Sequence, residues 1–257
     1  MIISLGQLVV FFLILARIAG VFLQAPIFNS RSFPFFAKTA ICVWTAIVLW
    51  FVTPVHGSLP EALPALILAL IFEVAIGFVI GFTCNIIFLA IQAAGEIMDL
   101  QMGLSVATAL DPVFGSVISV IGRLAFFIAL IVFITADGHH LVLAALHQSF
   151  TALPAGKMAN FSSPLLAQQM IQLGSNLWFT AIKLAAPAIL LIFISDFSFG
   201  IVSRVAPQVN VFMLGFQVKP SLGLLGLLMS LPFMVKYINK LIEFMAEQLV
   251  VLANSIK

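Results

Sequence analysis

The chain has 257 residues, of which 63% are hydrophobic and only 8% are charged, and its mean hydropathy is +1.25. A soluble domain usually carries about a quarter charged residues, so these values exclude an ordinary water-soluble fold and predict an integral membrane protein. The net charge of +2 is too small and too scattered to indicate nucleic-acid binding. Because Arg17 interrupts the first apolar run and no basic segment precedes it, we expect no cleaved signal peptide.

Six apolar runs predict membrane helices and therefore an all-α protein. The first would be about 30 Å long as a helix, which matches one hydrocarbon core. The second is shorter than a comfortable span, whereas the third would reach about 45 Å and must tilt, bend or protrude. In chain order the runs are Ile3–Phe22, Thr39–Val52, Ala65–Ala94, Val117–Ala136, Asn176–Ser203 and Ser221–Asn254.

Turns and loops are expected between these runs. The proline-rich stretch Thr53–Pro64 is typical of a turn region, and Asp137–His140 is predicted to end the fourth run. A short apolar stretch then reaches Phe150, and we expect a polar linker from there to about Gly174. Pro187 is a predicted kink within the fifth run.

Two further patterns concern packing and topology. Gly77 and Gly81 form a G-x-x-x-G pair, which allows close helix contact but is common in membrane helices. Cys42 and Cys84 lie in apolar runs without C-x-x-C spacing, which indicates buried reduced thiols. Since basic residues favour the cytoplasm, we expect the loops that hold two cation pairs to be cytoplasmic, namely Arg31 with Lys38 and Arg204 with Lys219.

The sequence contains no motif for catalysis, so we expect neither an enzyme nor a cofactor site. H-E-x-x-H, G-x-S-x-G and the phosphate-binding G-x-x-x-x-G-K-[ST] are all absent. Asp137, His139 and His140 could coordinate a metal ion. However, neighbouring histidines without a third and fourth ligand are usually plain loop residues, and we therefore predict no metal site.

Four charged residues lie inside the apolar runs: Arg17, Glu73, Arg123 and Lys183. Each costs about 2.5–3.5 kcal/mol at the centre of a bilayer, so each needs a partner or a wet cavity. They could form a proton or substrate pathway, as in a stand-alone secondary transporter. They could instead be structural, pairing within the chain or at contacts with other subunits. We favour the structural explanation, because the chain shows no evident internal repeat of the kind that many transporters carry.

Four stretches of the chain resemble one known family. They are RIAGVFLQAPIFNSRSFPFFAK near the start, GEIMDLQMGLSVATALDP in the middle, DGHHLVLAAL after it, and VSRVAPQVNVFMLGFQVKPSLGLL near the end. In this order and spacing they resemble the FliR family, core export-gate subunits of the flagellar type III secretion apparatus, and the match covers nearly the whole chain. Injectisomes carry an equivalent subunit, but the motifs favour the flagellar member.

The resemblance implies a hetero-oligomeric assembly in the bacterial inner membrane at the flagellar basal body. One copy would join FliP-type and FliQ-type subunits in a helical pore that conducts unfolded export substrates, with an FlhB-type protein at the cytoplasmic entrance. Residues 1–175 would be the part similar to the P-type subunit, and residues 176–257 would be a hairpin similar to the Q-type subunit. Neighbouring subunits would then supply partners for Glu73, Arg123 and Lys183.

The resemblance also implies two candidate sites. The first is a loop near residues 103–122 that enters and plugs the pore. Its small side chains would pack in a narrow lumen and obstruct a passing chain little. Its residues are Gly103, Leu104, Ser105, Val106, Ala107, Thr108, Asp111, Pro112, Phe114 and Gly115. The alternative is a connecting loop on a subunit surface.

The second candidate site is a cytoplasmic hairpin tip near residues 204–220. It is apolar enough to bind a partner and polar enough to remain hydrated. Its residues are Arg204, Pro207, Asn210, Phe212, Gly215, Phe216 and Lys219. The resemblance predicts contact with adjacent Q-type tips and with the FlhB-type protein. A plain solvated turn is the alternative.

Overall fold

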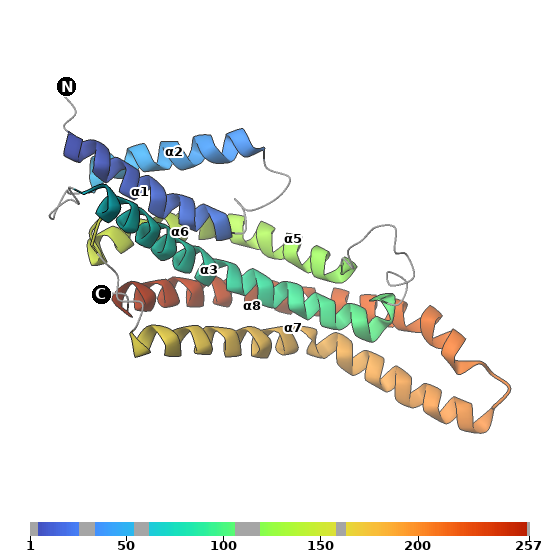
Figure 1. Cartoon of the computed structure of the whole chain (residues 1–257). Coiled ribbons are helices and arrows are strands. Elements are labelled where there is room, and N and C mark those ends of the chain that lie inside the picture. The colour runs from blue at the N-terminus through green and yellow to red at the C-terminus, as the bar shows by residue number, and fades with distance from the viewer. Residues whose placement is uncertain (1–4, 26–33, 54–61, 106–118, 158–162, 256–257) are drawn as a thin grey trace. The chain divides into compact units, whose positions relative to one another are not determined.

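The computed structural model describes residues 5–25, 34–53, 62–105, 119–157 and 163–255. All the long elements in these ranges are helices, which confirms the predicted all-α class (Figure 1). In chain order they are α1 (Leu5–Gln24), α2 (Phe35–Val52), α3 (Leu63–Met102), α5 (Val120–Thr135), α6 (Gly138–Ala152), α7 (Pro164–Val205) and α8 (Val211–Ser255).

Five of the helices that the structure describes are long and apolar enough to cross a membrane: α1, α2, α3, α7 and α8. A sixth candidate arises if α5 and α6 are taken as one broken span. In the membrane windows of these helices between 11% and 39% of the residues are buried within the chain. Most of their apolar surface is therefore left for lipid or for other proteins, and the chain is an integral membrane protein.

The chain divides into two compact units. Unit 1 contains Met1–Ile87, Asp137–Gly174 and Ile242–Lys257, and unit 2 contains Phe88–Ala136 and Ser175–Leu241. Each unit therefore combines segments that are distant in the sequence. The predicted division into residues 1–175 and 176–257 rests on family resemblance and stays a prediction.

In unit 1, α1 packs against the first part of α3 through glycine residues, which have no side chain. A Cβ atom on Gly20 would collide with the backbone carbonyl of Val74, and one on Gly77 with that of Arg17. A Cβ on Gly81 would lie 2.6 Å from the carbonyl oxygen of Val21. Gly77 and Gly81, the predicted G-x-x-x-G pair, thus bring two helix backbones into contact, as small residues do in membrane proteins.

In unit 2, the second part of α3 packs against α5 through aromatic rings and a glycine pair. The ring of Phe88 lies 5.7 Å from that of Phe126 and 5.4 Å from that of Phe133, measured between centroids. Further along, a Cβ atom on Gly95 would lie 2.3 Å from Gly122 Cα, and one on Gly122 would lie 2.5 Å from Ser119 Oγ. The aromatic and glycine contacts together place the start of α5 beside the end of α3.

The other half of unit 2 is a helical hairpin made by α7 and α8 (Figure 1). The two helices meet where Gly226 faces Ala188, whose Cα would lie 3.2 Å from an added Cβ. Pro187 lies within α7, as predicted, and Pro220 and Pro232 lie within α8. Proline is tolerated in membrane helices because neighbouring groups satisfy the backbone carbonyl that it leaves unpaired.

The predicted polar linker that ends near Gly174 is wrong, because α7 begins at Pro164. The first three turns of α7 are rich in glutamine, yet Leu166, Gln169 and Leu173 are buried at helical spacing. The amide of Gln169 donates to the backbone oxygen of Gln248 at 3.1 Å. One polar group with a partner was sufficient to keep this segment helical and packed.

Three other helices also extend beyond the predicted runs. Helix α2 begins at Phe35 rather than Thr39, α3 continues to Met102 rather than ending near Ala94, and α8 begins at Val211 rather than Ser221. Charged residues follow the apolar run at Ala94, and a proline precedes the run at Ser221. Helices α3 and α8 nevertheless continue through these residues. The connection between α7 and α8 is consequently only five residues, Ala206–Asn210.

The glycine contact between α1 and α3 predicts that Gly77→Ala destabilises the protein. The new methyl group would meet the backbone of Arg17, which cannot move aside as a side chain can. We expect a loss of about 1–3 kcal/mol, the usual cost of overpacking, seen as earlier thermal unfolding in detergent. Gly174→Ala is the matched control, since no atom lies within 4 Å of its added Cβ. Equal unfolding temperatures for the two variants would contradict the proposed contact.

Candidate functional site

A buried ion pair links α1 to α3 within unit 1. Arg17 Nε donates to Glu73 Oε2 at 2.5 Å, and the two side chains have exposed fractions of 0% and 1%. Arg17 is one of the largest fully buried side chains among the described residues. A charged hydrogen bond in such an apolar setting is strong, and neither ion could be buried at this depth without the other.

The rest of the network comes from the end of α6 and the turn that follows it. Arg17 Nη1 donates to Ser149 Oγ at 3.2 Å and to the backbone oxygen of Leu153 at 3.0 Å. The guanidinium carbon lies 4.1 Å from the ring centroid of Phe150. Glu73 Oε1 accepts a hydrogen bond from the backbone nitrogen of Gly156 at 2.8 Å. Apart from Arg17 Nη2, the polar atoms of both side chains therefore find hydrogen-bond partners within the same chain.

Gly156 holds its place in this network through its backbone geometry. Its φ is +85°, in the left-handed region that side-chain-bearing residues rarely adopt. The turn that presents the amide of Gly156 to Glu73 thus depends on glycine at this position.

These contacts pair Arg17 with Glu73 inside the chain, which was one of the structural explanations considered from the sequence. The structure leaves neither side chain any surface for the subunit contacts expected of them, and Glu73 needs no partner from a neighbour. Arg123 and Lys183 differ, because both are exposed in the isolated chain. Lys183 Nζ lies 4.2 Å from the ring centroid of Phe179, and no acid pairs with Arg123 among the described residues.

Only the two ends of the predicted pore loop lie within the described residues. Gly103, Leu104 and Ser105 follow α3 and are partly exposed, and Gly103 has a φ of +78°. Val106, Ala107, Thr108, Asp111, Pro112, Phe114 and Gly115 lie outside the described residues.

Polar contacts tie the far end of this loop to α3. Asp99 is 3% exposed, and its two carboxylate oxygens accept from the backbone nitrogen of Ile121 at 3.3 and 3.2 Å. Ser119 caps α5 by accepting from the backbone nitrogen of Gly122 at 2.7 Å. An acidic group at a helix N-terminus is stabilised by the helix dipole. The start of α5, where the chain re-enters the described fold, is therefore anchored to α3, and no sequence pattern pointed to this role of Asp99.

The hairpin tip is exposed on both of its sides. Arg204, Pro207, Phe212 and the other residues from Gly200 to Val205 and Pro207 to Asn210 lie at the surface. Asn210 caps α8, since its side-chain oxygen accepts from the backbone nitrogen of Met213 at 3.2 Å. Phe212 is 76% exposed, although its ring packs edge-on against that of Phe216 with 4.8 Å between centroids.

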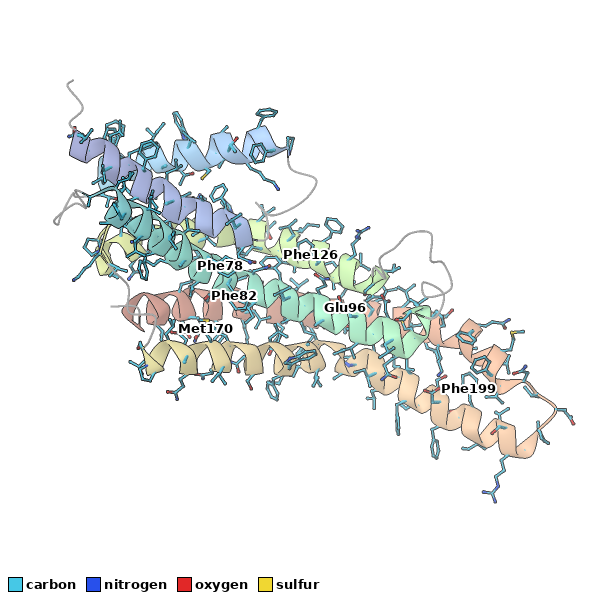
Figure 2. All side chains as sticks on the ribbon, viewed as in Figure 1. Phe78, Phe82, Glu96, Phe126, Met170 and Phe199 are labelled. Carbon is cyan, nitrogen blue, oxygen red and sulfur yellow. The ribbon has the colours of Figure 1, made fainter. Side chains whose placement is uncertain are left out.

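A pocket of about 430 Å³ lies next to the tip, within unit 2. Phe199, which Figure 2 labels on α7, lines it together with Met102, Gly103, Gly215 and Phe216. Lys219 also lines the pocket, and its Nζ lies 2.6 Å from Asp196 Oδ1. Lys219 therefore bridges the two helices of the hairpin, and of the two predicted flanking cations it is Arg204 that stays free of an acid among the described residues.

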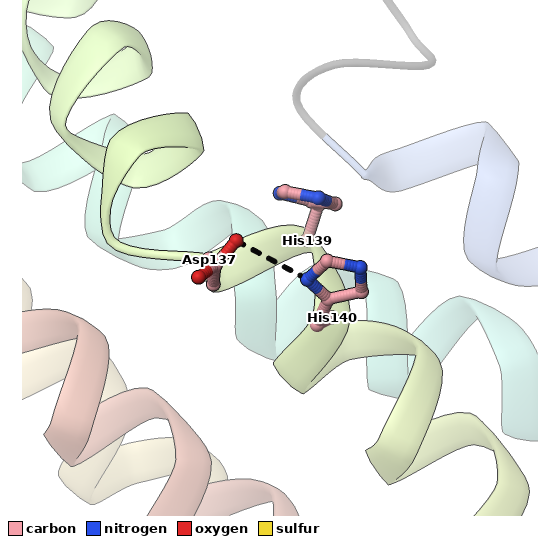
Figure 3. Close-up of side chains that lie close together, drawn as sticks. All are labelled: Asp137, His139 and His140. Atoms are coloured by element: carbon pink, nitrogen blue, oxygen red, sulfur yellow. Dashed lines mark hydrogen bonds and ion pairs between the residues drawn. The ribbon is translucent and has the colours of Figure 1, made fainter.

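A small polar cluster marks the start of α6 (Figure 3). Asp137, His139 and His140 each offer a ligand atom, and these atoms all lie within 4.8 Å of one another. His140 Nδ1 and Asp137 Oδ1 are 3.3 Å apart, and the two imidazole rings have centroids 4.1 Å apart.

Comparison with known proteins identifies the class. Residues 8–245 match the family described as bacterial export proteins, family 1. A "Flagellar biosynthetic protein FliR" of Pectobacterium carotovorum subsp. carotovorum is 31% identical over 249 residues, covering 95% of this chain and 94% of the relative. That of Escherichia coli (strain K12) is 31% identical over 247 residues, covering 95% and 94%. The "Secretion system apparatus protein SsaT" of Salmonella typhimurium (strain LT2) is 30% identical over 161 residues, covering 63% and 62%.

The helical membrane fold and the match of residues 8–245 to this family together identify the chain as a bacterial export protein. The chain belongs to family 1 of the bacterial export proteins, and the predicted FliR resemblance is confirmed. The names of these relatives denote flagellar biosynthesis or a secretion apparatus, and none of the three names an enzymatic activity.

The buried network predicts that Arg17→Met and Glu73→Gln each destabilise the chain strongly. Each change leaves one buried charge without its counterion, and breaking a buried pair typically costs about 3–5 kcal/mol. The measurement is thermal unfolding and steady-state abundance in the membrane. Lys236→Met is the control, because this lysine is exposed and forms no ion pair among the described residues. The double variant that combines Arg17→Met with Glu73→Gln should lose less than the sum of the single changes, and strict additivity would contradict the pairing.

Proposed function

We propose that this chain is a pore-forming core subunit of the flagellar type III protein export gate, which conducts unfolded substrates across the bacterial inner membrane. The observation that carries the proposal is the match over residues 8–245 to a family of export proteins, with flagellar FliR proteins among the relatives. It covers the buried network, both ends of the predicted pore loop and the hairpin tip, so these candidate sites all lie within the matched region.

The distribution of apolar surface supports assembly with other subunits. On the hairpin, the outward apolar residues Phe193, Phe197, Leu228, Met229 and Phe233 are each at least 58% exposed in the isolated chain. Lipid can cover such residues within a bilayer, but helices of 42 and 45 residues are about twice the length of one span. Neighbouring subunits of the FliP and FliQ types would cover the excess. Arg123 and Lys183 would find their partners at the same contacts.

The hairpin tip is proposed as a contact for adjacent Q-type tips and for the FlhB-type protein at the cytoplasmic entrance. Its support is the exposure of Phe212 and Arg204 beside a short, capped turn. An aromatic and an arginine on a rigid turn form the kind of surface that is enriched in protein interfaces.

Residues 103–122 are proposed as the plug of the pore. Support comes from the anchoring of the loop, since Asp99 and Ser119 hold the start of α5 and Gly103 ends α3 with a left-handed residue. The two ends of the proposed plug are thus set by the end of α3 and by the start of α5.

The buried network disfavours the alternative of a stand-alone proton-coupled transporter. A coupling residue must exchange protons with water, yet Arg17 and Glu73 are sealed from solvent and paired with each other in the chain. The remaining charged candidates, Arg123 and Lys183, are cations and do not provide the carboxylate of a proton relay.

The proposed function predicts that the chain purifies in one large complex with its FliP-type and FliQ-type partners. Co-expression followed by affinity purification and mass measurement checks this expectation. Expressed alone in detergent, the chain should aggregate or form heterogeneous species, because its long apolar helices lack their covering subunits. A uniform monomer or dimer with transport activity in vesicles would favour the transporter instead.

The proposed tip contact predicts that the double variant Phe212→Asp and Phe216→Asp impairs export while the complex still assembles. Two carboxylates on an apolar contact surface must be desolvated when a partner binds, which lowers affinity strongly. Flagellar protein secretion and swimming motility measure export, and co-purification measures assembly. The double variant Gln208→Asp and Gln217→Asp is the control, since it places the same two charges on exposed polar positions instead of the two aromatic ones. Normal secretion by the double variant would refute the contact.

A further inference from the structure

We propose that Asp137, His139 and His140 form a binding site for one divalent transition-metal ion, with Zn²⁺ as the first ion to test. The site is independent of the proposed export function and lies at the start of α6, within unit 1 (Figure 3). It also departs from the sequence analysis, which expected neighbouring histidines here to be plain loop residues.

The geometry of the carboxylate and the second imidazole already suits coordination. Asp137 Oδ1 and His140 Nδ1 are 3.3 Å apart. In a tetrahedral zinc site with bonds of about 2.0–2.1 Å, two ligand atoms are separated by about 3.3 Å. An ion can therefore replace the shared proton between these two groups without a shift of the backbone. A ligand atom of His139 completes a set of three within 4.8 Å, a distance that side-chain rotation can shorten.

The carboxylate of Asp137 makes no helix-capping hydrogen bond that would compete with a metal ion. Aspartate at the N-cap of a helix usually accepts hydrogen bonds from the first backbone amides. Asp137 occupies that position for α6 but makes no such bond, and its φ of 55° turns the residue away from the usual capping conformation. The side chains of Asp137 and His140 are 74% and 68% exposed, so an ion can reach them from solution.

His139 supplies a second, separate indication. Its Nδ1 atom is buried and has no hydrogen-bond partner among the described residues. Buried polar atoms nearly always have a partner, and one that lacks it calls for a bound ion or water. The centroid of its ring lies 4.1 Å from that of His140, so the two imidazoles are in direct contact.

The donor set selects the class of ion. Two imidazoles with one carboxylate are ligands of zinc and of neighbouring transition metals, whereas Mg²⁺ and Ca²⁺ prefer oxygen donors. Three protein ligands leave a fourth position for water or for a side chain of another subunit. A bound ion would fix residues 137–140, the point at which the chain leaves α5 and begins α6.

The experiment measures Zn²⁺ in the purified full-length complex, prepared with an affinity tag that contains no histidine. We expect one tightly bound Zn²⁺ per copy of this chain, in titration calorimetry and in elemental analysis after dialysis, and no comparable binding of Mg²⁺. In His140→Gln the affinity should fall by at least about tenfold, since even the loss of an outer partner costs about 10–100-fold. His147→Gln, on the same helix but outside the cluster, is the matched control and should bind as the native chain does.

A second variant keeps the test decisive if His140→Gln disturbs folding. Asp137→Asn removes the carboxylate but retains a residue that tolerates the left-handed conformation, so α6 should begin as before. It too should lower the Zn²⁺ affinity, while size-exclusion profiles stay unchanged. Absence of bound Zn²⁺, or equal binding by the native chain and both variants, would overturn the proposal. The contact between Asp137 and His140 would then be a hydrogen bond only.

Discussion

The ion pair between Arg17 and Glu73 is the interaction on which the first unit of this protein depends. Two charges that each resist burial in an apolar fold become tolerable only because they neutralise each other and because Ser149, Leu153 and Gly156 add hydrogen bonds to them. The pair also needs the helices to be close, and Gly20 and Gly77 provide that closeness by omitting side chains at the crossing. Charge pairing and glycine packing thus require each other, and both fix α1 on α3.

The second unit has an ion pair of its own. Its hairpin holds Lys219 against Asp196 beside an open pocket, buries Ser195 and Ser230, and displays apolar side chains outward. Both units also leave large apolar side chains uncovered, such as Phe36 and Trp44 in the first and Phe197 and Met229 in the second. In a family of export proteins, such surface is available to lipid or to other proteins.

Hydrophobic runs in the sequence were enough to place the membrane helices, but not their ends. The predicted runs for α1 and α5 differ from the helices by at most three residues, because those runs are uniformly apolar. Helix α3 passes the end of its predicted apolar run because Asp99, a charged residue beyond that run, is buried and accepts from the backbone nitrogen of Ile121 in α5. Helix α7 began earlier than expected because Gln169 has a hydrogen-bond partner that lies 79 residues away in the chain. The candidate site shows the same limit. The sequence shows that Arg17 and Glu73 are charges whose burial in an apolar run is unfavourable. It leaves open whether they pair within the chain, since 56 residues separate them and no local pattern encodes the contact.

The separation between Arg17 and Glu73 has a consequence for how the nascent polypeptide enters the bilayer. Helix α1 leaves the ribosome with its cation long before α3 supplies the anion, and the last groups of the network, Leu153 and Gly156, are synthesised later still. Until then the arginine has no counterion, and its placement at the centre of the bilayer costs about 2.5–3.5 kcal/mol. Helix α1 therefore carries an unpaired arginine until α3 has been synthesised, and the ion pair that fixes it on α3 can form only when both helices are present.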